Sequence, residues 1–171
     1  SMEELKNWYQ KLLDDYHKWI SCSLSWKKER NASMKDLQFP FPYREGQREI
    51  VSGVYHTVSS KKTLFVQAPT GVGKTMSAIF PSVRAIGEGK GETLFYLTAK
   101  TITGTVAWEA FHTLRENGLK FKVTAITAKE KLCFLDSPEC TPEKCPYAKG
   151  HFDRVNDAVY ELWTTEEVYS R

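Results

Sequence analysis

The sequence predicts an α/β fold: a partial parallel β-sheet flanked by helices, preceded by an N-terminal helix and followed by a cysteine-containing insertion. Two observations predict it. Short apolar segments typical of strands, at residues 64–66, 93–97 and 121–126, alternate with amphipathic helical patterns at 74–86 and 101–117. This order favours parallel strands joined by right-handed crossovers. A glycine-containing loop also lies directly between the first strand and the first of these helices.

Helical and extended patterns also surround the predicted sheet. Apolar residues recur every three or four positions over 3–26, which predicts one amphipathic helix whose apolar stripe packs on another part of the protein. A polar connector is expected at 27–35, and alternating prolines predict extended chain at 39–43. Further helices are predicted over 44–58 and 153–163.

Together these patterns divide the chain into three parts. Residues 1–38 are expected to form the N-terminal helix and connector. Residues 39–128 hold the predicted sheet, and 129–171 hold the cysteine-containing insertion.

Composition excludes several classes of protein. The 171 residues are 41% hydrophobic and 26% charged, as in ordinary globular domains, and the net charge is +3. No apolar run approaches the roughly 18 residues of a membrane helix, and the N-terminus lacks a signal-peptide pattern. We therefore expect a cytoplasmic protein without a membrane partner, in which four cysteines are not a disulfide framework.

The loop between the first predicted strand and its helix has the chemistry of a phosphate site. Gly71 and Gly73 allow the backbone to wrap around phosphate oxygens, and the start of the helix at Lys74 adds its positive end. Lys74 supplies a full charge to the outer phosphates, and Thr75 offers a hydroxyl to Mg²⁺. We predict that ATP is bound here by Ala68, Pro69, Thr70, Gly71, Val72, Gly73, Lys74 and Thr75.

This loop differs from the general phosphate-loop pattern in one position. Ala68 stands where the pattern has its first glycine, and Gly73-Lys74-Thr75 match. The combination resembles motif I of superfamily-2 helicases. Upstream, Arg44 and Gln47 are similar to the Arg-x-x-Gln element that such helicases place against adenine, so the resemblance implies that both residues bind the nucleotide.

A second segment carries the resemblance further. The run Tyr96-Leu97-Thr98-Ala99-Lys100-Thr101 resembles motif Ia, which grips the backbone of single-stranded DNA in these helicases. Hydroxyls, a lysine and free N–H groups at a helix start suit phosphates without reading sequence. The residues implied in DNA binding are Thr98, Lys100, Thr101 and Thr103. The alternative is an ordinary loop and helix cap.

Three cysteines lie within thirteen residues: Cys133, Cys140 and Cys145. Thiols this close are suited to metal. The segments 128–133 and 139–148 resemble the iron–sulfur domain of the XPD/DinG family of helicases, which implies a [4Fe–4S] cluster and a RecA-like P-loop NTPase fold. A fourth cysteine ligand would then lie beyond residue 171. A Cys3His zinc site with His151, or three unliganded thiols, are the alternatives.

The resemblance is incomplete in two respects. No Asp-Glu-Ala-His motif, which would hold Mg²⁺ and activate water, occurs in the chain, and a second motor domain is missing. We therefore expect an N-terminal piece of motor domain 1 of an ATP-dependent DNA helicase, inactive alone and partnered by single-stranded DNA and by the rest of its polypeptide. The alternatives are a non-enzymatic, zinc-stabilised nucleic-acid-binding module with a nucleotide site, and a phosphate-loop kinase.

Overall fold

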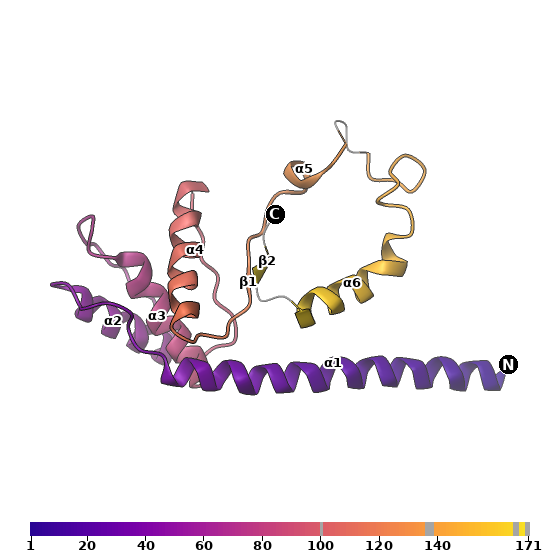
Figure 1. Cartoon of the computed structure of the whole chain (residues 1–171), viewed down its shortest axis with the longest axis horizontal. Coiled ribbons are helices and arrows are strands. Elements are labelled where there is room, and N and C mark those ends of the chain that lie inside the picture. The colour runs from indigo at the N-terminus through magenta and orange to yellow at the C-terminus, as the bar shows by residue number, and fades with distance from the viewer. Residues whose placement is uncertain (100, 136–138, 166–167, 170–171) are drawn as a thin grey trace. The chain divides into compact units, whose positions relative to one another are not determined.

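The structure is a computed structural model that describes the chain except for residues 100, 136–138, 166–167 and 170–171. Side chains at 101–103 and 168–169 are also not described. The described residues form six helices and two strands of two residues each (Figure 1). In chain order these are α1 (Met2–Asp36), α2 (Gln47–Ser60), α3 (Lys74–Gly87), α4 (Thr101–Glu116), β1 (Val123–Thr124), α5 (Lys129–Leu132), α6 (His151–Thr165) and β2 (Val168–Tyr169).

The chain divides into two compact units. One comprises Ser1–Ser23 together with Lys122–Arg171, and the other comprises Leu24–Phe121. The candidate nucleotide site lies in the second unit, and the cysteines of the insertion lie in the first. No helix among the described residues is long and apolar enough to cross a membrane.

The predicted α/β fold with a parallel sheet is wrong for this structure. The described part of the chain is mainly helical, and its strand pairing is limited to β1 and β2, whose Val123 and Thr124 pair in parallel with Val168 and Tyr169. The predicted strands at 64–66 and 93–97 are extended chain without strand pairing among the described residues.

The side chains of these extended segments show the physical reason for the difference. Phe65 is 93% exposed, Leu97 is 87% exposed, and Phe95 is also exposed. A strand of a parallel sheet is stabilised by hydrogen bonds to neighbouring strands and by burial of both its faces. Here neither contribution is made, so the apolar character of the segments alone does not produce a sheet.

The helices agree better with the sequence. α3 and α4 were predicted over 74–86 and 101–117, and each differs from its prediction by one residue at its C-terminal end. α6 extends two residues beyond its prediction at each end. α2 begins later than predicted because Gly46, in the left-handed conformation with φ 72°, is its N-cap.

The polar connector predicted at 27–35 is wrong, because α1 continues through it. This half of the helix is anchored by contacts to distant residues. Lys27 and Arg30 bind the Glu92 carboxylate at 2.7 and 3.3 Å, and Glu29 binds Lys120 at 2.8 Å. Tertiary contacts therefore sustain helix where the local sequence has no apolar stripe.

The core of the unit Leu24–Phe121 is built around α3. This helix contacts both α2 and α4 (Figure 1). Ile79 and Val83 of α3 are buried, as are Met34 in the last turns of α1 and Leu37 just after this helix. On α4, Ala107, Ala110, Phe111 and Leu114 are buried, whereas Val106 is 41% exposed.

In the other unit, the aromatic rings of α1 and α6 meet. The ring centroid of Trp19 lies 4.9 Å from that of Tyr160 and 6.0 Å from that of Trp163, and the Lys18 ammonium lies over the Tyr160 ring. Leu13 of the predicted apolar stripe is half-buried, whereas most of the stripe is exposed. The prediction that the stripe packs on another part of the protein is therefore wrong for Leu5, Trp8, Tyr9, Leu12, Tyr16 and Ile20, and for Leu24, which belongs to the unit Leu24–Phe121.

Candidate nucleotide-binding site

The loop of residues 68–75 leads directly into the first turn of α3. Gly71 and Gly73 both have positive φ, 85° and 79°. Gly73 is the N-cap of α3, and no side chain caps this helix start in the described structure. A helix N-terminus of this kind presents amide N–H groups and the positive end of the helix dipole, which together favour an anion.

The Lys74 side chain folds back onto its own loop. Its ammonium donates to the carbonyl oxygen of Ala68 at 3.0 Å and to that of Pro69 at 2.7 Å. The side chain remains exposed, and among the described residues its ammonium contacts these two neutral carbonyls. A phosphate oxygen is a stronger acceptor for an ammonium than a carbonyl, because both partners are then charged.

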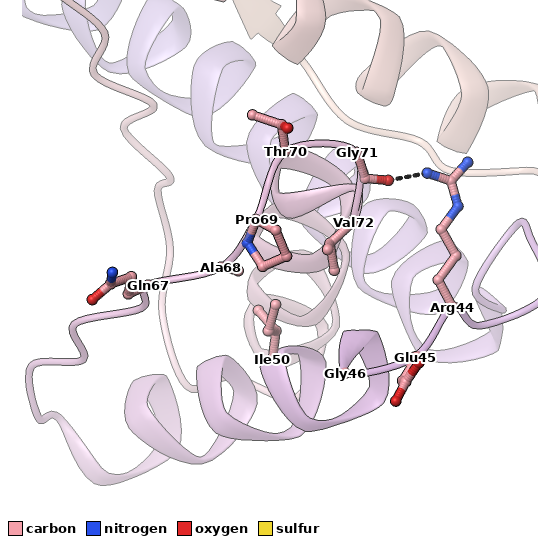
Figure 2. Close-up of a pocket in the computed structure, with 10 residues that line it drawn as sticks. All are labelled: Arg44, Glu45, Gly46, Ile50, Gln67, Ala68, Pro69, Thr70, Gly71 and Val72. Carbon is pink, nitrogen blue, oxygen red and sulfur yellow. Dashed lines mark hydrogen bonds between the residues drawn. The ribbon is translucent and has the colours of Figure 1, made fainter.

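Arg44 and Gln47, the predicted adenine contacts, lie against the phosphate loop. The Arg44 guanidinium donates to the carbonyl oxygen of Gly71 (Figure 2). Gln47 is buried, and its side-chain oxygen accepts the Arg44 backbone N–H at 3.0 Å. Its amide nitrogen lies 2.7 Å from the place where a Cβ on Gly73 would stand. Both residues therefore support the loop backbone, and their contact with adenine stays a prediction.

An open cavity of about 610 Å³ lies beside the loop. It is lined on one side by the residues that lead into α2 and on the other by the loop, and Figure 2 shows the Gln67 side chain directed away from Arg44. This volume falls in the range of about 300–1,000 Å³ that small-molecule sites occupy. The lining residues are Arg44, Glu45, Gly46, Ile50, Gln67, Ala68, Pro69, Thr70, Gly71 and Val72.

Thr75, the predicted ligand of Mg²⁺, is the second residue of α3 and is half-buried. Its hydroxyl lies 3.4 Å from the hydroxyl of Tyr96, and either atom can be the donor. Tyr96 was not predicted as a site residue. Its only sequence signal was its place just before Thr98, in the segment that resembles motif Ia.

The structure describes the predicted DNA-binding residues only in part. Thr98 is exposed at the end of the extended segment before α4. Lys100 lies outside the described residues, as do the side chains of Thr101 and Thr103. The backbone of α4 begins at Thr101, so the predicted helix start after this segment is confirmed.

The three predicted metal ligands are in different environments. Cys133 ends α5 and is half-buried, with its sulfur accepting the N–H of Leu135 at 3.4 Å. Cys140 is exposed and Cys145 is buried. His151, the zinc alternative, is exposed at the start of α6. In the described part of the chain no three such side chains gather as a metal site, and the [4Fe–4S] cluster stays a prediction.

One basic side chain of this region is tied to a cysteine. The Cys140 thiol, as hydrogen-bond partner and by its charge when ionised, raises the pKa of Lys129 above its ordinary value.

Comparison with known proteins gives a local match to a helicase. A probable ATP-dependent helicase of Methanocaldococcus jannaschii is 40% identical over 47 residues, which are 27% of this chain and 7% of that protein. No family model matches the chain, and no solved structure matches it. A relationship to helicases is thus supported, and the chain matches only a small part of that relative's length.

Proposed function

We propose that this chain binds ATP and Mg²⁺ at residues 68–75 and is the nucleotide-binding part of an ATP-dependent DNA helicase of the XPD/DinG-like kind. The observation that carries the proposal is the loop itself, with two positive-φ glycines, an uncapped helix start and the exposed Lys74 ammonium. The helicase match supports the class of protein.

In the proposed complex, contacts of this loop would be exchanged for contacts to phosphate. The start of α3 has no side-chain cap, and the first amide N–H groups of a helix have no partner within the helix. The Lys74 ammonium would exchange the Ala68 and Pro69 carbonyls for phosphate oxygens. Arg44, held by Gln47, fixes the loop at Gly71 from the other side. Bound Mg²⁺ would neutralise phosphate charge, and the Thr75 hydroxyl would hold it.

Single-stranded DNA is the second partner that we propose. Thr98, Lys100, Thr101 and Thr103 lie at and just before the start of α4. Hydroxyls, a lysine and the first amides of a helix can hold phosphates without reading base sequence. In the longer protein, ATP hydrolysis would drive movement along this strand.

Hydrolysis needs residues that this chain does not contain. In helicases of this kind an Asp-Glu-Ala-His motif supplies the carboxylates that hold Mg²⁺ and activate water, and the sequence contains no such motif. The chain should therefore bind nucleotide without hydrolysing it or unwinding DNA. Hydrolysis stimulated by single-stranded DNA is expected of a longer polypeptide that supplies this motif and a second motor domain.

Substitution of Lys74 tests the nucleotide site. Lys74→Ala should weaken binding of a fluorescent ATP analogue with Mg²⁺ by at least about tenfold, because one or more charge-assisted hydrogen bonds to phosphate are lost. Lys90→Ala, which removes an exposed lysine beyond the end of α3, is the matched control and should bind like the parent. Equal binding by Lys74→Ala and the parent would overturn the assignment.

A further inference from the structure

Tyr96 and Thr75 meet although they lie on different parts of the unit. Tyr96 belongs to the extended segment before α4, and Thr75 to the first turn of α3. Their hydroxyl oxygens are 3.4 Å apart, and the exposed fraction of Tyr96 is 37%. A residue outside the phosphate loop therefore contacts the one loop hydroxyl that we propose as a metal ligand.

Other hydroxyls of α3 bond inside the helix. Ser77 donates to the carbonyl of Gly73 at 3.0 Å, and Ser82 donates to that of Ala78 at 2.7 Å. Such a back-bond joins a residue to the carbonyl four positions earlier. For Thr75 that carbonyl is Gly71, which precedes the helix and accepts the Arg44 guanidinium. The Thr75 hydroxyl instead contacts the hydroxyl of Tyr96.

A hydroxyl that binds a metal has two requirements. An oxygen lone pair must face the cation, and the hydroxyl proton must point elsewhere, to an acceptor. The Tyr96 phenol oxygen can accept that proton, which would hold the Thr75 lone pairs in one orientation. A phenylalanine in its place would leave the Thr75 hydroxyl free to rotate.

We propose that Tyr96 is a positioning residue for the Mg²⁺ of the bound nucleotide, acting through the Thr75 hydroxyl. The inference rests on the proposed ATP site and assigns it a residue outside the loop. It also makes the segment that leads to Thr98 a structural neighbour of the metal position.

The test separates metal-dependent from metal-independent binding. Affinity for a fluorescent ATP analogue is measured with Mg²⁺ and with a chelator, and the ratio of the two dissociation constants gives the gain from the metal. Tyr96→Phe should lower this gain by about two- to tenfold, the range of one hydrogen bond, with unchanged affinity in chelator. Tyr55→Phe, whose hydroxyl bonds Glu88 beyond the end of α3, should keep the full gain.

A double-mutant cycle identifies the route. Thr75→Val should itself remove most of the gain, and adding Tyr96→Phe to it should then cause no further loss. An unchanged gain in Tyr96→Phe, or equal losses from Tyr96→Phe with and without Thr75, would overturn the role of Tyr96. Absence of nucleotide binding by the parent chain would instead overturn the proposed function, and with it this inference.

Discussion

At the scale of single residues, the loop at which we propose phosphate binding is supported by two side chains from outside it. Gln47 is buried, bonds the Arg44 backbone and lies behind Gly73, while the Arg44 guanidinium bonds Gly71. The shape of the loop thus depends on a glutamine outside it and on the absence of a side chain at Gly73. Nucleotide affinity and local stability should respond together to changes here.

A series of glycine substitutions tests this support. Gly71→Ala and Gly73→Ala each place a side chain in the left-handed region, at a cost of about 1–2 kcal/mol. Gly73→Ala should cost more, because its Cβ would stand 2.7 Å from the Gln47 amide whereas nothing lies within 4 Å at Gly71. Urea unfolding measures the difference.

The control for this series is Gly104→Ala in α4. Its Cβ would meet nothing within 4 Å, and alanine in a helix interior should raise the free energy of unfolding by about 0.5–1 kcal/mol. Equal stabilities of Gly71→Ala and Gly73→Ala would contradict the packing of Gln47 beneath Gly73.

Glu92 gives a residue-scale prediction for pH. Hydrogen bonds from Lys27 and Arg30, and the Lys27 charge, hold the pKa of Glu92 below its ordinary value of 4.5. A carboxyl whose pKa is lowered by folding stabilises the protein above its unfolded pKa, and that contribution is lost as pH falls through the folded pKa. The loss should therefore appear below about pH 4.5.

Glu92→Gln should remove this component from a plot of unfolding free energy against pH. Lys27→Met should remove part of it from the partner's side, and combining the two should add little. If the parent and Glu92→Gln kept the same acid dependence, the ion pairs would contribute nothing in solution, as exposed pairs sometimes do.

At the scale of elements, the two halves of α1 differ in their contacts. Its first half carries an apolar stripe that is mostly exposed, and its second half lacks such a stripe yet is anchored by ion pairs and by buried Met34. A Cβ added to Gly87 would stand only 2.5 Å from the Cβ of Met34. Close approach of α1 to the end of α3 therefore requires glycine at this position.

Met34→Ala tests this packing. Deleting a fully buried methionine side chain should lower the free energy of unfolding by about 2–5 kcal/mol, because it leaves a cavity beside α3. Leu24→Ala is the control on the same helix, since Leu24 is 63% exposed and its loss should change stability by less than about 0.5 kcal/mol. Similar unfolding midpoints for the two variants would show that the end of α1 is not docked.

Helices were predictable at this scale, whereas of the three predicted strands only that at 121–126 contains a strand among the described residues, the two-residue β1. The period of apolar residues, together with Gly73 before α3 and Gly118 after α4, located both helices to within a residue at their ends. A helix satisfies its backbone hydrogen bonds within its own segment. A strand needs a partner from elsewhere in the chain, and the segments at 64–66 and 93–97 have none among the described residues.

At the scale of the whole molecule, two units carry two different predicted chemistries. The nucleotide loop belongs to the unit Leu24–Phe121, and the three clustered cysteines belong to the unit formed by Ser1–Ser23 and Lys122–Arg171. The spacing of the cysteines in the sequence suits a metal, but the described geometry leaves Cys140 exposed and Cys145 buried. The iron–sulfur prediction therefore depends on a further ligand and on rearrangement.

Metal analysis tests that prediction. A [4Fe–4S] cluster needs four thiolates and this region supplies three, so the test uses the longer protein of which we propose this chain to be a part. Purified without oxygen, that protein should contain iron and acid-labile sulfide. Cys145→Ser should lower the iron content, and Cys22→Ser, on α1, should not. Stoichiometric zinc without iron would favour the Cys3His alternative.

The sequence by itself determined the glycine-containing loop at which we propose phosphate binding, the helices that flank it and the resemblance to helicases, because these depend on local spacing: glycines, one lysine, one threonine and an apolar period. Only the tertiary structure decided that Gln47 and Arg44 support the loop backbone, that Tyr96 reaches Thr75, and that α1 continues to Asp36. It also replaced the predicted sheet by extended chain. Each of these outcomes depends on contacts between residues distant in sequence, which no local pattern specifies.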